Sequence, residues 1–317
     1  MKLGFIGLGN VGGKLAGSLL RNGIDLTVRD LDPAVAQPFL DAGATWGESP
    51  AAMTEQVDLM ITCLPSPTIS DAVVTGPDGI MEAMQPGKIW AEMSTTDEAE
   101  VRRLGALVAE AGGEPIDCPV SGGCHRAATG NIAIFAGCER ETFERALPIL
   151  TTMGRRILHT GGLGSASMLK VMTNYLATAN LVTLAEALTV SKAAGMDLNT
   201  TYEAIRISSG NSFVHETESQ VILNGSRDIN FTMDLVSKDI GIFQEIADRH
   251  DVPLEVSPVL IDIFKDGEER YGSRELSPNI IRRLEDATGL EILAPGFPPE
   301  MVDDEPEEPG YEVVVRR

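Results

Sequence analysis

Three glycines near the amino terminus constrain the folding of this chain more than any other feature of its sequence. Gly7, Gly9 and Gly12 form a G-x-G-x-x-G pattern directly after the apolar segment LGFIG and at the head of a helical pattern. There, glycines permit a tight strand-to-helix turn, and the N–H groups that open the helix can hold a pyrophosphate. The alternative is a tight turn that binds no ligand.

An acidic residue at the end of the second predicted strand makes this common pattern more specific. Asp30 closes the segment DLTVRD, where a carboxylate can accept hydrogen bonds from the ribose diol of an adenosine. The same carboxylate would repel a 2′-phosphate, and the next residue, Leu31, is uncharged. We therefore expect NAD rather than NADP. NADP is the alternative, because near the end of the strand the Arg29 side chain can turn toward the nucleotide.

The first half of the chain has the alternation of a parallel α/β sheet. From Lys2 to about Thr160, short apolar segments alternate with helical patterns, as in sheets covered by helices on both faces. Helices are expected from Val11 and from Pro33. Strands are expected in LGFIG, DLTVRD, VDLMITCL and GKIWAEM, and at Glu114–Cys118, Ile132–Gly137 and Arg156–His159.

The second half reads as helical throughout. Apolar residues recur at helical spacing from Ser165 to about Ala194, which predicts one long helix that can join two domains. We expect a dinucleotide-binding domain at 1–162, an all-α domain with the long helix at 163–290, and an acidic, proline-rich tail at 291–317. The tail should be extended or disordered, and dispensable for hydride transfer. The later helices are expected at about 200–207, 234–250, 254–271 and 279–285.

The charge composition limits the kinds of molecule that the protein can bind. The formal net charge is −22, with 47 acidic and 25 basic residues, so nucleic acids and anionic membranes should be repelled. A small anionic substrate can still bind, since aimed N–H groups act locally. The longest uncharged stretch is too short to cross a bilayer and the start lacks a secretory signal, so a cytoplasmic protein is expected. The four cysteines and four histidines lack metal-site spacing, so no metal is expected.

Four ordered blocks give the chain a resemblance to a known family. They are GFIGLGNVGGKLAGSLL, DCPVSGG, GLGSASMLKVMTN and FTMDLVSKD, and the similarity covers about residues 2–287. Together they resemble the β-hydroxyacid dehydrogenases, which include 3-hydroxyisobutyrate dehydrogenase and tartronate semialdehyde reductase. The resemblance implies a Rossmann-like N-terminal domain, a long interdomain helix and a helical C-terminal domain that supports a homodimer or homotetramer.

The resemblance also implies roles for individual residues. Lys170 would be the general acid/base, and Asn174, one helical turn further, would orient the substrate. A buried lysine beside a cationic nicotinamide can lose its own proton. Ser121, Gly122 and Gly123 would bind the substrate carboxylate. The cofactor side would comprise Gly7, Leu8, Gly9, Asn10, Val11, Gly12, Asp30, Leu64, Pro65, Ser94, Thr95 and Lys238.

Each of these residues also has an ordinary structural explanation. A lone S-G-G is typical of a turn after a strand, and Leu64-Pro65 and Ser94-Thr95 can be strand-end turns. Lys170 can be a solvated lysine with Asn174 packed nearby. Lys238, which is followed by Asp239, can be a surface cation. The segment that contains Asn211, Ser212, Phe213 and His215 lies where the family varies its specificity, and His215 can be a packed helix residue.

Two departures from the family pattern refine the expected activity. The usual Gly-x-Gly before the lysine reads Gly164-Ser165-Ala166, which changes one loop position. Thr173 replaces the histidine of 6-phosphogluconate dehydrogenase, and that enzyme's long C-terminal region is absent, which disfavours sugar-phosphate decarboxylation. We expect interconversion of a small β-hydroxyacid and its semialdehyde. A γ-hydroxyacid, sulfonate or amino-alcohol dehydrogenase is the alternative, and a non-catalytic NAD-binding protein is a more remote one.

Overall fold

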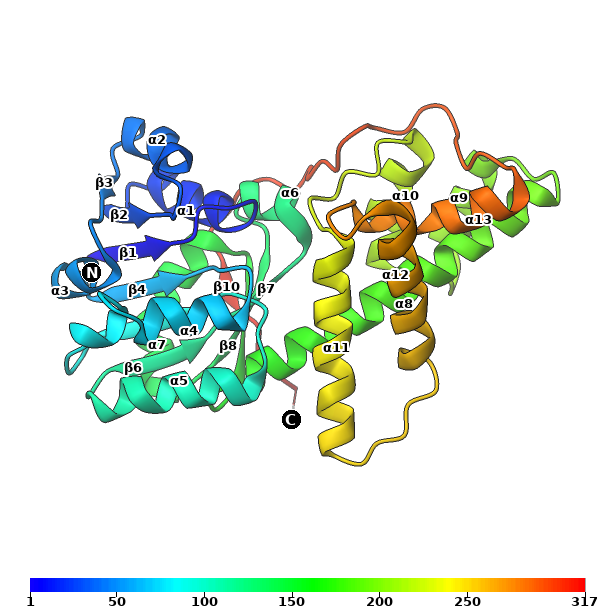
Figure 1. Cartoon of the computed structure of the whole chain (residues 1–317). Coiled ribbons are helices and arrows are strands. Elements are labelled where there is room, and N and C mark those ends of the chain that lie inside the picture. Colours follow the sequence, from blue (N-terminus) through cyan, green and yellow to red (C-terminus); the bar gives the residue numbers. More distant parts are fainter. Residues whose placement is uncertain (317) are drawn as a thin grey trace. The chain divides into compact units, whose positions relative to one another are not determined.

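The computed structural model describes residues 1–316, which form two compact units (Figure 1). Unit 1 contains residues 1–170 together with residues 303–316 of the tail, and unit 2 is Val171–Val302. The division falls inside the long helix, and the end of the tail belongs to the first unit. The mixed α/β unit followed by a helical unit confirms the predicted fold class.

Unit 1 is built on one ten-stranded sheet in the order β10-β9-β8-β6-β5-β4-β1-β2-β3, with β7 paired to β8. The strands from β3 to β6 in this order are all parallel. The strands are β1 (Leu3–Ile6), β2 (Leu26–Arg29), β3 (Thr45–Trp46), β4 (Leu59–Thr62), β5 (Ile89–Glu92), β6 (Glu114–Asp117), β7 (Val120–Ser121), β8 (Ala133–Gly137), β9 (Arg156–Gly161) and β10 (Tyr311–Glu312).

The sheet is not parallel throughout, which differs from the prediction. β8 is antiparallel to β6 and β7, while β9 and β10 continue parallel to β8. The reversal arises because the chain turns back through β7 and a short helix, α6 (Gly123–Ala128), instead of crossing over the sheet. This reversal lies at the predicted Ser121–Gly123 turn.

Helices flank the sheet, and three of them begin with the same two-residue signal. Asp32, Ser49 and Ser66 each accept a backbone N–H bond from the helix they precede, and a proline follows each. These are a favourable N-cap and a favourable first helical residue. The helices of unit 1 are α1 (Gly12–Arg21), α2 (Pro33–Asp41), α3 (Pro50–Gln56), α4 (Pro67–Thr75), η1 (Ile80–Glu82), α5 (Glu98–Glu110), α6 and α7 (Arg140–Met153).

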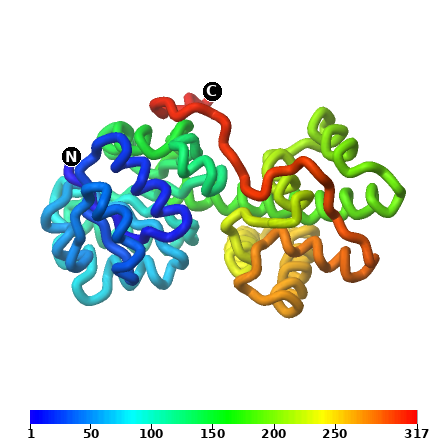
Figure 2. Tube along the Cα trace, turned by 90° about the horizontal axis from the view of Figure 1, so that it is seen from above, coloured from blue at the N-terminus to red at the C-terminus, as the bar shows by residue number. Residues whose placement is uncertain are grey.

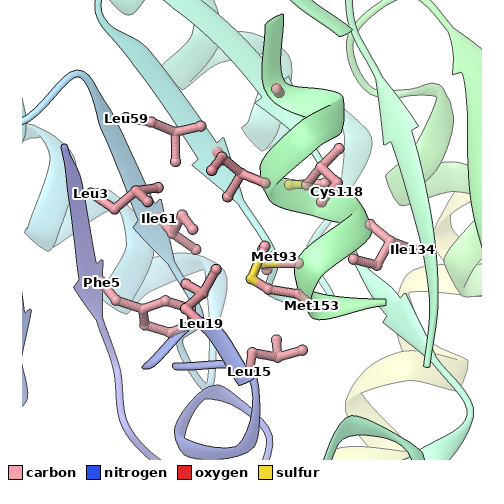
Figure 3. Packing of buried hydrophobic residues seen from close by; sticks show 14 of the residues in the cluster. Leu3, Phe5, Leu15, Leu19, Leu59, Ile61, Met93, Cys118, Ile134 and Met153 are labelled. Atoms are coloured by element: carbon pink, nitrogen blue, oxygen red, sulfur yellow. The ribbon is translucent and has the colours of Figure 1, made fainter. Parts of the chain in front are cut away.

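Alternate strand residues fill the two cores of unit 1. Phe5 and Ile61 belong to one buried cluster (Figure 3), whereas Ile6 and Met60 belong to another. Neighbouring residues of a strand point to opposite faces, so both faces of the sheet are covered. Buried central strands explain why these segments are apolar at nearly every position.

Unit 2 is helical around a single main core. The long helix α8 (Ser165–Ala193) ends within one residue of its predicted end. The sequence pattern did not predict α10, because its apolar residues lie at its two ends, Phe213–Val214 and Val221–Leu223, with six polar residues between them. The remaining helices are α9 (Leu198–Arg206), α10 (Phe213–Asn224), α11 (Met233–Arg249), α12 (Ser257–Tyr271), η2 (Ser277–Ile281) and α13 (Arg282–Thr288). None of the helices within residues 1–316 has the length and apolar character required to cross a membrane.

The acidic tail is extended, but it is not detached. Residues 303–316 run along unit 1, and β10 pairs with β9 at the edge of the sheet. Figure 2 shows this segment, in red, beside the first unit. The expectation of a disordered tail overlooked its basic partners, which lie far away in the sequence on α1, α6 and α7 and around β9.

Candidate functional site

The glycine turn between β1 and α1 is tightly packed on one side and open on the other. Gly7 has a φ of +98°, a conformation that favours glycine, and a Cβ on Gly12 would lie 2.0 Å from the Gly7 carbonyl oxygen. No atom lies within 4 Å of the position of a Cβ on Gly9. The first and third glycines thus bring α1 against the turn, and the second leaves room for a ligand.

Asp30 lies directly beside this turn. Its Oδ2 accepts the backbone N–H of Leu8 at 2.7 Å, which fixes the carboxylate next to the glycines. The neighbouring residue, Leu31, is 99% exposed and carries no charge. The site therefore presents a fixed negative group where the resemblance places an adenosine ribose.

Arg29 is engaged on the other side of its strand. Its Nη1 donates to the carbonyl oxygens of Gly47 at 2.8 Å and Glu48 at 2.6 Å, and its guanidinium lies over the ring of Trp46, 5.4 Å from the centroid. These contacts hold the cation near β3. The Arg29 side chain therefore points toward Gly47 and Glu48, a direction that the sequence alone did not decide.

A buried carboxylate joins the two strand-end segments that were predicted to face the cofactor. Ser94 accepts the backbone N–H of Leu64 at 2.7 Å, and both the N–H (2.8 Å) and hydroxyl of Ser94 donate to Glu92. Glu92 is 1% exposed, and burial raises the pKa of its carboxyl group against the opposing effect of the Ser94 hydrogen bonds. Sequence analysis missed this residue, although an acid inside the apolar segment GKIWAEM was a usable signal.

The predicted Ser121–Gly123 turn has a backbone that only glycine adopts readily. Gly122 and Gly123 have φ values of +130° and +88°. Ser121 ends β7, opposite Ala133 of β8, so the turn leaves and re-enters the sheet at a fixed point. Without side chains on the two glycines, a ligand can approach the backbone closely.

Lys170 lies in the second turn of α8, in unit 1, and is 8% exposed. The start of this helix is fixed by Asp117 at the end of β6. The carboxylate of Asp117 accepts the N–H of Gly164 at 2.8 Å and that of Ser167 at 2.7 Å. Asp117 is fully buried, and burial raises its pKa although these hydrogen bonds oppose the rise. Sequence analysis had not assigned it a role.

Asn174, one turn further along α8, belongs to a polar group in unit 2. Its Nδ2 donates to Oδ2 of Asp239 at 2.5 Å, and the Lys238 ammonium lies 3.0 Å from Oδ1 of the same carboxylate. Asp239 is buried, so it is a shared anchor for two predicted site residues. From the sequence, Asp239 was considered only as the residue that follows a possible surface cation, Lys238.

Not every residue considered in the sequence lies in such a group. His215 is buried in unit 2, where its Nε2 lies 2.9 Å from the Tyr202 carbonyl oxygen and its ring contacts the Tyr202 ring. Burial lowers its pKa, so it is a packed residue that favours the neutral form. Among residues 1–316, no group of three or more histidine, cysteine or acidic residues could hold a metal ion.

Two family models together match nearly the whole folded part of the chain. Residues 2–162 match the NAD-binding domain of 6-phosphogluconate dehydrogenase, and residues 164–284 match the NAD-binding model of NADP-dependent 3-hydroxyisobutyrate dehydrogenase. The chain belongs to the β-hydroxyacid dehydrogenase family. As a β-hydroxyacid dehydrogenase, it is an oxidoreductase that acts on CH–OH groups with NAD or NADP.

Individual β-hydroxyacid dehydrogenases are similar over almost their whole length. The chain is 32% identical to 2-(hydroxymethyl)glutarate dehydrogenase of Eubacterium barkeri, over 92% of this chain and 97% of that enzyme. It is 31% identical to mitochondrial 3-hydroxyisobutyrate dehydrogenase of Rattus norvegicus, over 83% and 81%. The crystal structure of 3-hydroxyisobutyrate dehydrogenase from Salmonella typhimurium superposes with a TM-score of 0.81 at 25% identity, over 89% of this chain and 99% of that one.

Proposed function

We propose that this β-hydroxyacid dehydrogenase oxidises the hydroxyl group of a small β-hydroxyacid to the semialdehyde, and catalyses the reverse reduction when metabolite ratios favour it. The observation that carries the proposal is a buried lysine, Lys170, on a helix whose start is fixed by Asp117. A lysine held at a fixed position on a helix is a group that can exchange a proton with a substrate hydroxyl.

Each part of the chain has a defined task in this reaction. The N–H groups of the Gly7–Gly12 turn bind the cofactor pyrophosphate, and Asp30 accepts hydrogen bonds from its ribose. When bound, the nicotinamide cofactor would supply the acceptor for the hydride of the alcohol carbon. Lys170 removes the hydroxyl proton at its Nζ, and in reduction it returns that proton to the oxygen.

The substrate is held at both of its ends. The Ser121 hydroxyl and the backbone N–H groups of Gly122 and Gly123 bind the carboxylate. The family resemblance assigns the orientation of the substrate to Asn174, which is held by Asp239, and a role toward the cofactor to Lys238. Asp239 thus keeps two polar side chains in fixed orientations, which lowers the entropic cost of a reactive geometry.

The cofactor in this proposal is NAD. The Asp30 carboxylate would repel a 2′-phosphate, Leu31 offers no cation, and the Arg29 guanidinium is held by carbonyl oxygens near β3. A 2′-phosphate would therefore meet one negative charge without compensation. An assembly of two or four copies is also part of the proposal.

The Ser121–Gly123 turn indicates an anionic group at one end of the substrate, but it does not fix the distance from that group to the hydroxyl. The two relatives described above are named for 2-(hydroxymethyl)glutarate and 3-hydroxyisobutyrate. In both compounds, a hydroxymethyl group is attached to the carbon that bears a carboxylate. A γ-hydroxyacid, a sulfonate or an amino alcohol would place the hydroxyl at a different distance from the Ser121–Gly123 turn. These are the alternatives within the enzyme class, and a non-catalytic NAD-binding protein is the alternative outside it.

A substrate panel with ester controls tests the proposal. We expect 3-hydroxyisobutyrate or 2-(hydroxymethyl)glutarate to be oxidised with a higher kcat/KM than 4-hydroxybutyrate, a hydroxyalkyl sulfonate or an amino alcohol, and with NAD better than with NADP. The methyl ester of the best acid should lose about tenfold or more in kcat/KM, since the donors of the turn are left unpaired. Equal efficiency for acid and ester would contradict the anion site, and turnover of no compound would favour the non-catalytic alternative.

A further inference from the structure

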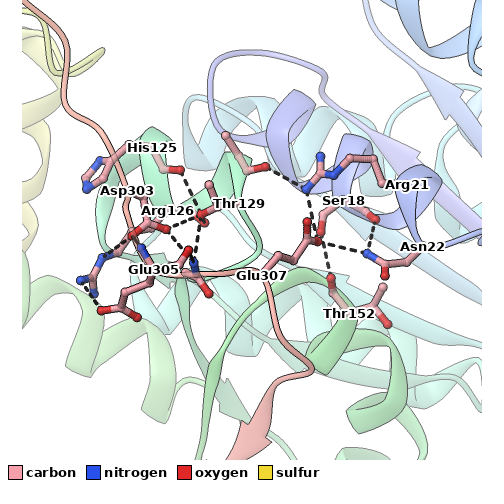
Figure 4. Close-up of polar contacts among 12 residues, drawn as sticks. Ser18, Arg21, Asn22, His125, Arg126, Thr129, Thr152, Asp303, Glu305 and Glu307 are labelled. Atoms are coloured by element: carbon pink, nitrogen blue, oxygen red, sulfur yellow. Dashed lines mark hydrogen bonds and ion pairs between the residues drawn. The ribbon is translucent and has the colours of Figure 1, made fainter.

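The tail of unit 1 makes an ordered set of polar contacts outside the regions that the two family models match. Those models end at residue 284, and the contacts begin at Asp303. Figure 4 shows the central part of this set, in which acidic side chains of the tail meet basic and amide groups of α1, α6 and the following turn. The ion pairs of the tail are Arg21–Glu307, Arg126–Asp303, Arg126–Glu305, Arg140–Glu312, Arg155–Glu308 and Arg156–Glu305.

Asp303 differs from the other acids of the tail because its side chain is buried, at 3% exposure. Its Oδ2 accepts hydrogen bonds from the Thr129 hydroxyl and from Nδ2 of Asn131, the latter at 2.7 Å. The same Asn131 amide donates to the Glu305 carbonyl oxygen at 2.8 Å. Burial alone would raise the pKa of Asp303, but the hydrogen bonds from Thr129 and Asn131 outweigh it and the pKa lies below its usual value.

These contacts lie on the segment that begins with the proposed substrate turn. The segment leaves the sheet after Ser121, continues through α6 and returns at Ala133, and those two residues are paired across β7 and β8. Its far end is closed by the Asn131 N–H, which donates to the Arg126 carbonyl oxygen at 2.8 Å. The tail therefore holds one end of α6, and the Gly122–Gly123 turn forms the other.

The length of α6 makes this coupling direct. The helix has six residues, which corresponds to an axial length of about 9 Å, so a shift at Thr129 reaches the turn with little room for relaxation. A second support comes from α1, where Arg21 donates to the carbonyl oxygen of Ala128 at 2.8 Å and lies 3.4 Å from Glu307. The end of α6 thus has its carbonyl oxygen and its polar side chains fixed.

We propose that Asp303 is a positioning residue for substrate binding: through Thr129 and Asn131 it holds α6, and with it the orientation of the Ser121–Gly123 turn toward the anionic group of the substrate. This inference rests on the proposed function of that turn. It is compatible with a tail that is dispensable for hydride transfer, because the effect of Asp303 is on substrate binding; Asp303 and the turn belong to the same unit.

The chain supplies a matched control for the test. Asp304 follows directly, carries the same charge, and is exposed. In the full-length protein, we expect Asp303→Ala to raise KM for the best hydroxyacid of the panel about three- to thirtyfold, while kcat and KM for NAD change less than about twofold. Asp304→Ala should leave all three constants unchanged. Asp303→Asn should recover part of the loss, because its oxygen can accept the hydrogen bonds from Thr129 and Asn131, whereas its amide cannot accept the Glu305 N–H or pair with Arg126.

Amide hydrogen exchange provides a readout that needs no substrate. Exchange in residues 122–131 should become faster in Asp303→Ala and stay unchanged in Asp304→Ala. Unchanged exchange, equal effects of the two alanine variants, or an equal rise of KM for NAD would overturn the proposal. Ser121→Ala separates the two hypotheses: if it leaves KM for the hydroxyacid unchanged, the substrate turn itself is wrong, whereas the exchange data still decide whether the tail orders α6.

Discussion

At the residue scale, the buried ionisable side chains distinguish the site from an ordinary core. Charged groups are costly to bury unless they are paired or hydrogen-bonded, and Glu92 and Asp239 have such partners. Glu92 accepts two bonds from Ser94, and Asp239 meets Asn174 and Lys238. Polar groups with such partners are held in one orientation, which is what a reaction that moves a hydride and a proton requires.

Lys170→Ala should lower kcat by about a hundred- to ten-thousandfold, because it removes the proposed general acid/base. NAD affinity should change little, since the proposal assigns cofactor binding to the glycine turn and Asp30. Steady-state kinetics with a parallel titration of NAD binding checks both statements.

Lys192→Ala is the matched control, since it removes the same charge from the last turn of the same helix. It should leave kcat unchanged. A Lys170→Ala enzyme that keeps more than about a tenth of the original kcat would exclude Lys170 as the acid/base, and Lys238 would be tested next.

The sequence predicts some of these residues and not others, for a physical reason. Gly7, Gly9 and Asp30 lie in one strand-turn-helix-strand unit, so their spacing along the chain reports their spacing in the fold. Asp117 and Asp239 act on backbone or side chains about fifty residues or more away. Only tertiary packing brings such partners together, and no local pattern records it.

At the element scale, the start of α8 illustrates how a strand can fix a helix. The first N–H groups of a helix have no partners within it. Asp117, at the end of β6, accepts two N–H groups from this region, and its negative charge also suits the positive end of the helix dipole. Because Lys170 lies in the second turn, the same contact sets the position of the proposed acid/base.

Asp117→Ala should lower the free energy of unfolding by about 2–5 kcal/mol, because two buried N–H groups lose their acceptor. Asp117→Asn should lose less, since one oxygen remains. Urea denaturation checks both. As a control, Asp32→Ala removes the exposed N-cap of α2 and should cost only about 1 kcal/mol. If the losses for Asp117→Ala and Asp32→Ala are equal, the Asp117 carboxylate does not anchor α8 as described.

Elements with a strong period were predicted best. The long apolar repeat of α8 and the buried segments of β1, β4 and β5 appear where the sequence indicated. The two-residue strands β3, β7 and β10 carry no period that could reveal them, because their existence depends on a neighbouring strand. The antiparallel direction of β8 depends on the glycine turn before α6, and its geometry is not evident from composition.

At the scale of the whole molecule, the large negative net charge affects the stability of the folded state. With 47 acidic and 25 basic residues, pairing every basic residue would still leave an excess of 22 negative charges. The ion pairs of the tail reduce this repulsion locally but cannot cancel it. A compact state with a large net charge is destabilised by self-repulsion, which salt screens.

Raising NaCl from about 0.01 M to about 1 M shortens the screening length from about 30 Å to about 3 Å. At pH 7 we expect Tm to rise, because screening relieves more repulsion than it weakens surface ion pairs. Near pH 4.5, the pI of the sequence, the rise should vanish because the net charge does. Thermal melts at both pH values check this, and a Tm that falls with salt at pH 7 would show that the ion pairs dominate.

The return of the tail to unit 1 also bears on how the molecule is synthesised. Unit 2 is inserted, in the order of translation, between residue 170 and residue 303 of the first unit. A ribosome therefore delivers the central sheet early and its outermost strand, β10, only after all of unit 2 has been made. Until then β9 is an open edge, a template on which a foreign strand can pair. A nascent chain of this protein thus has a period of vulnerability to aggregation that ends when its own tail closes the sheet.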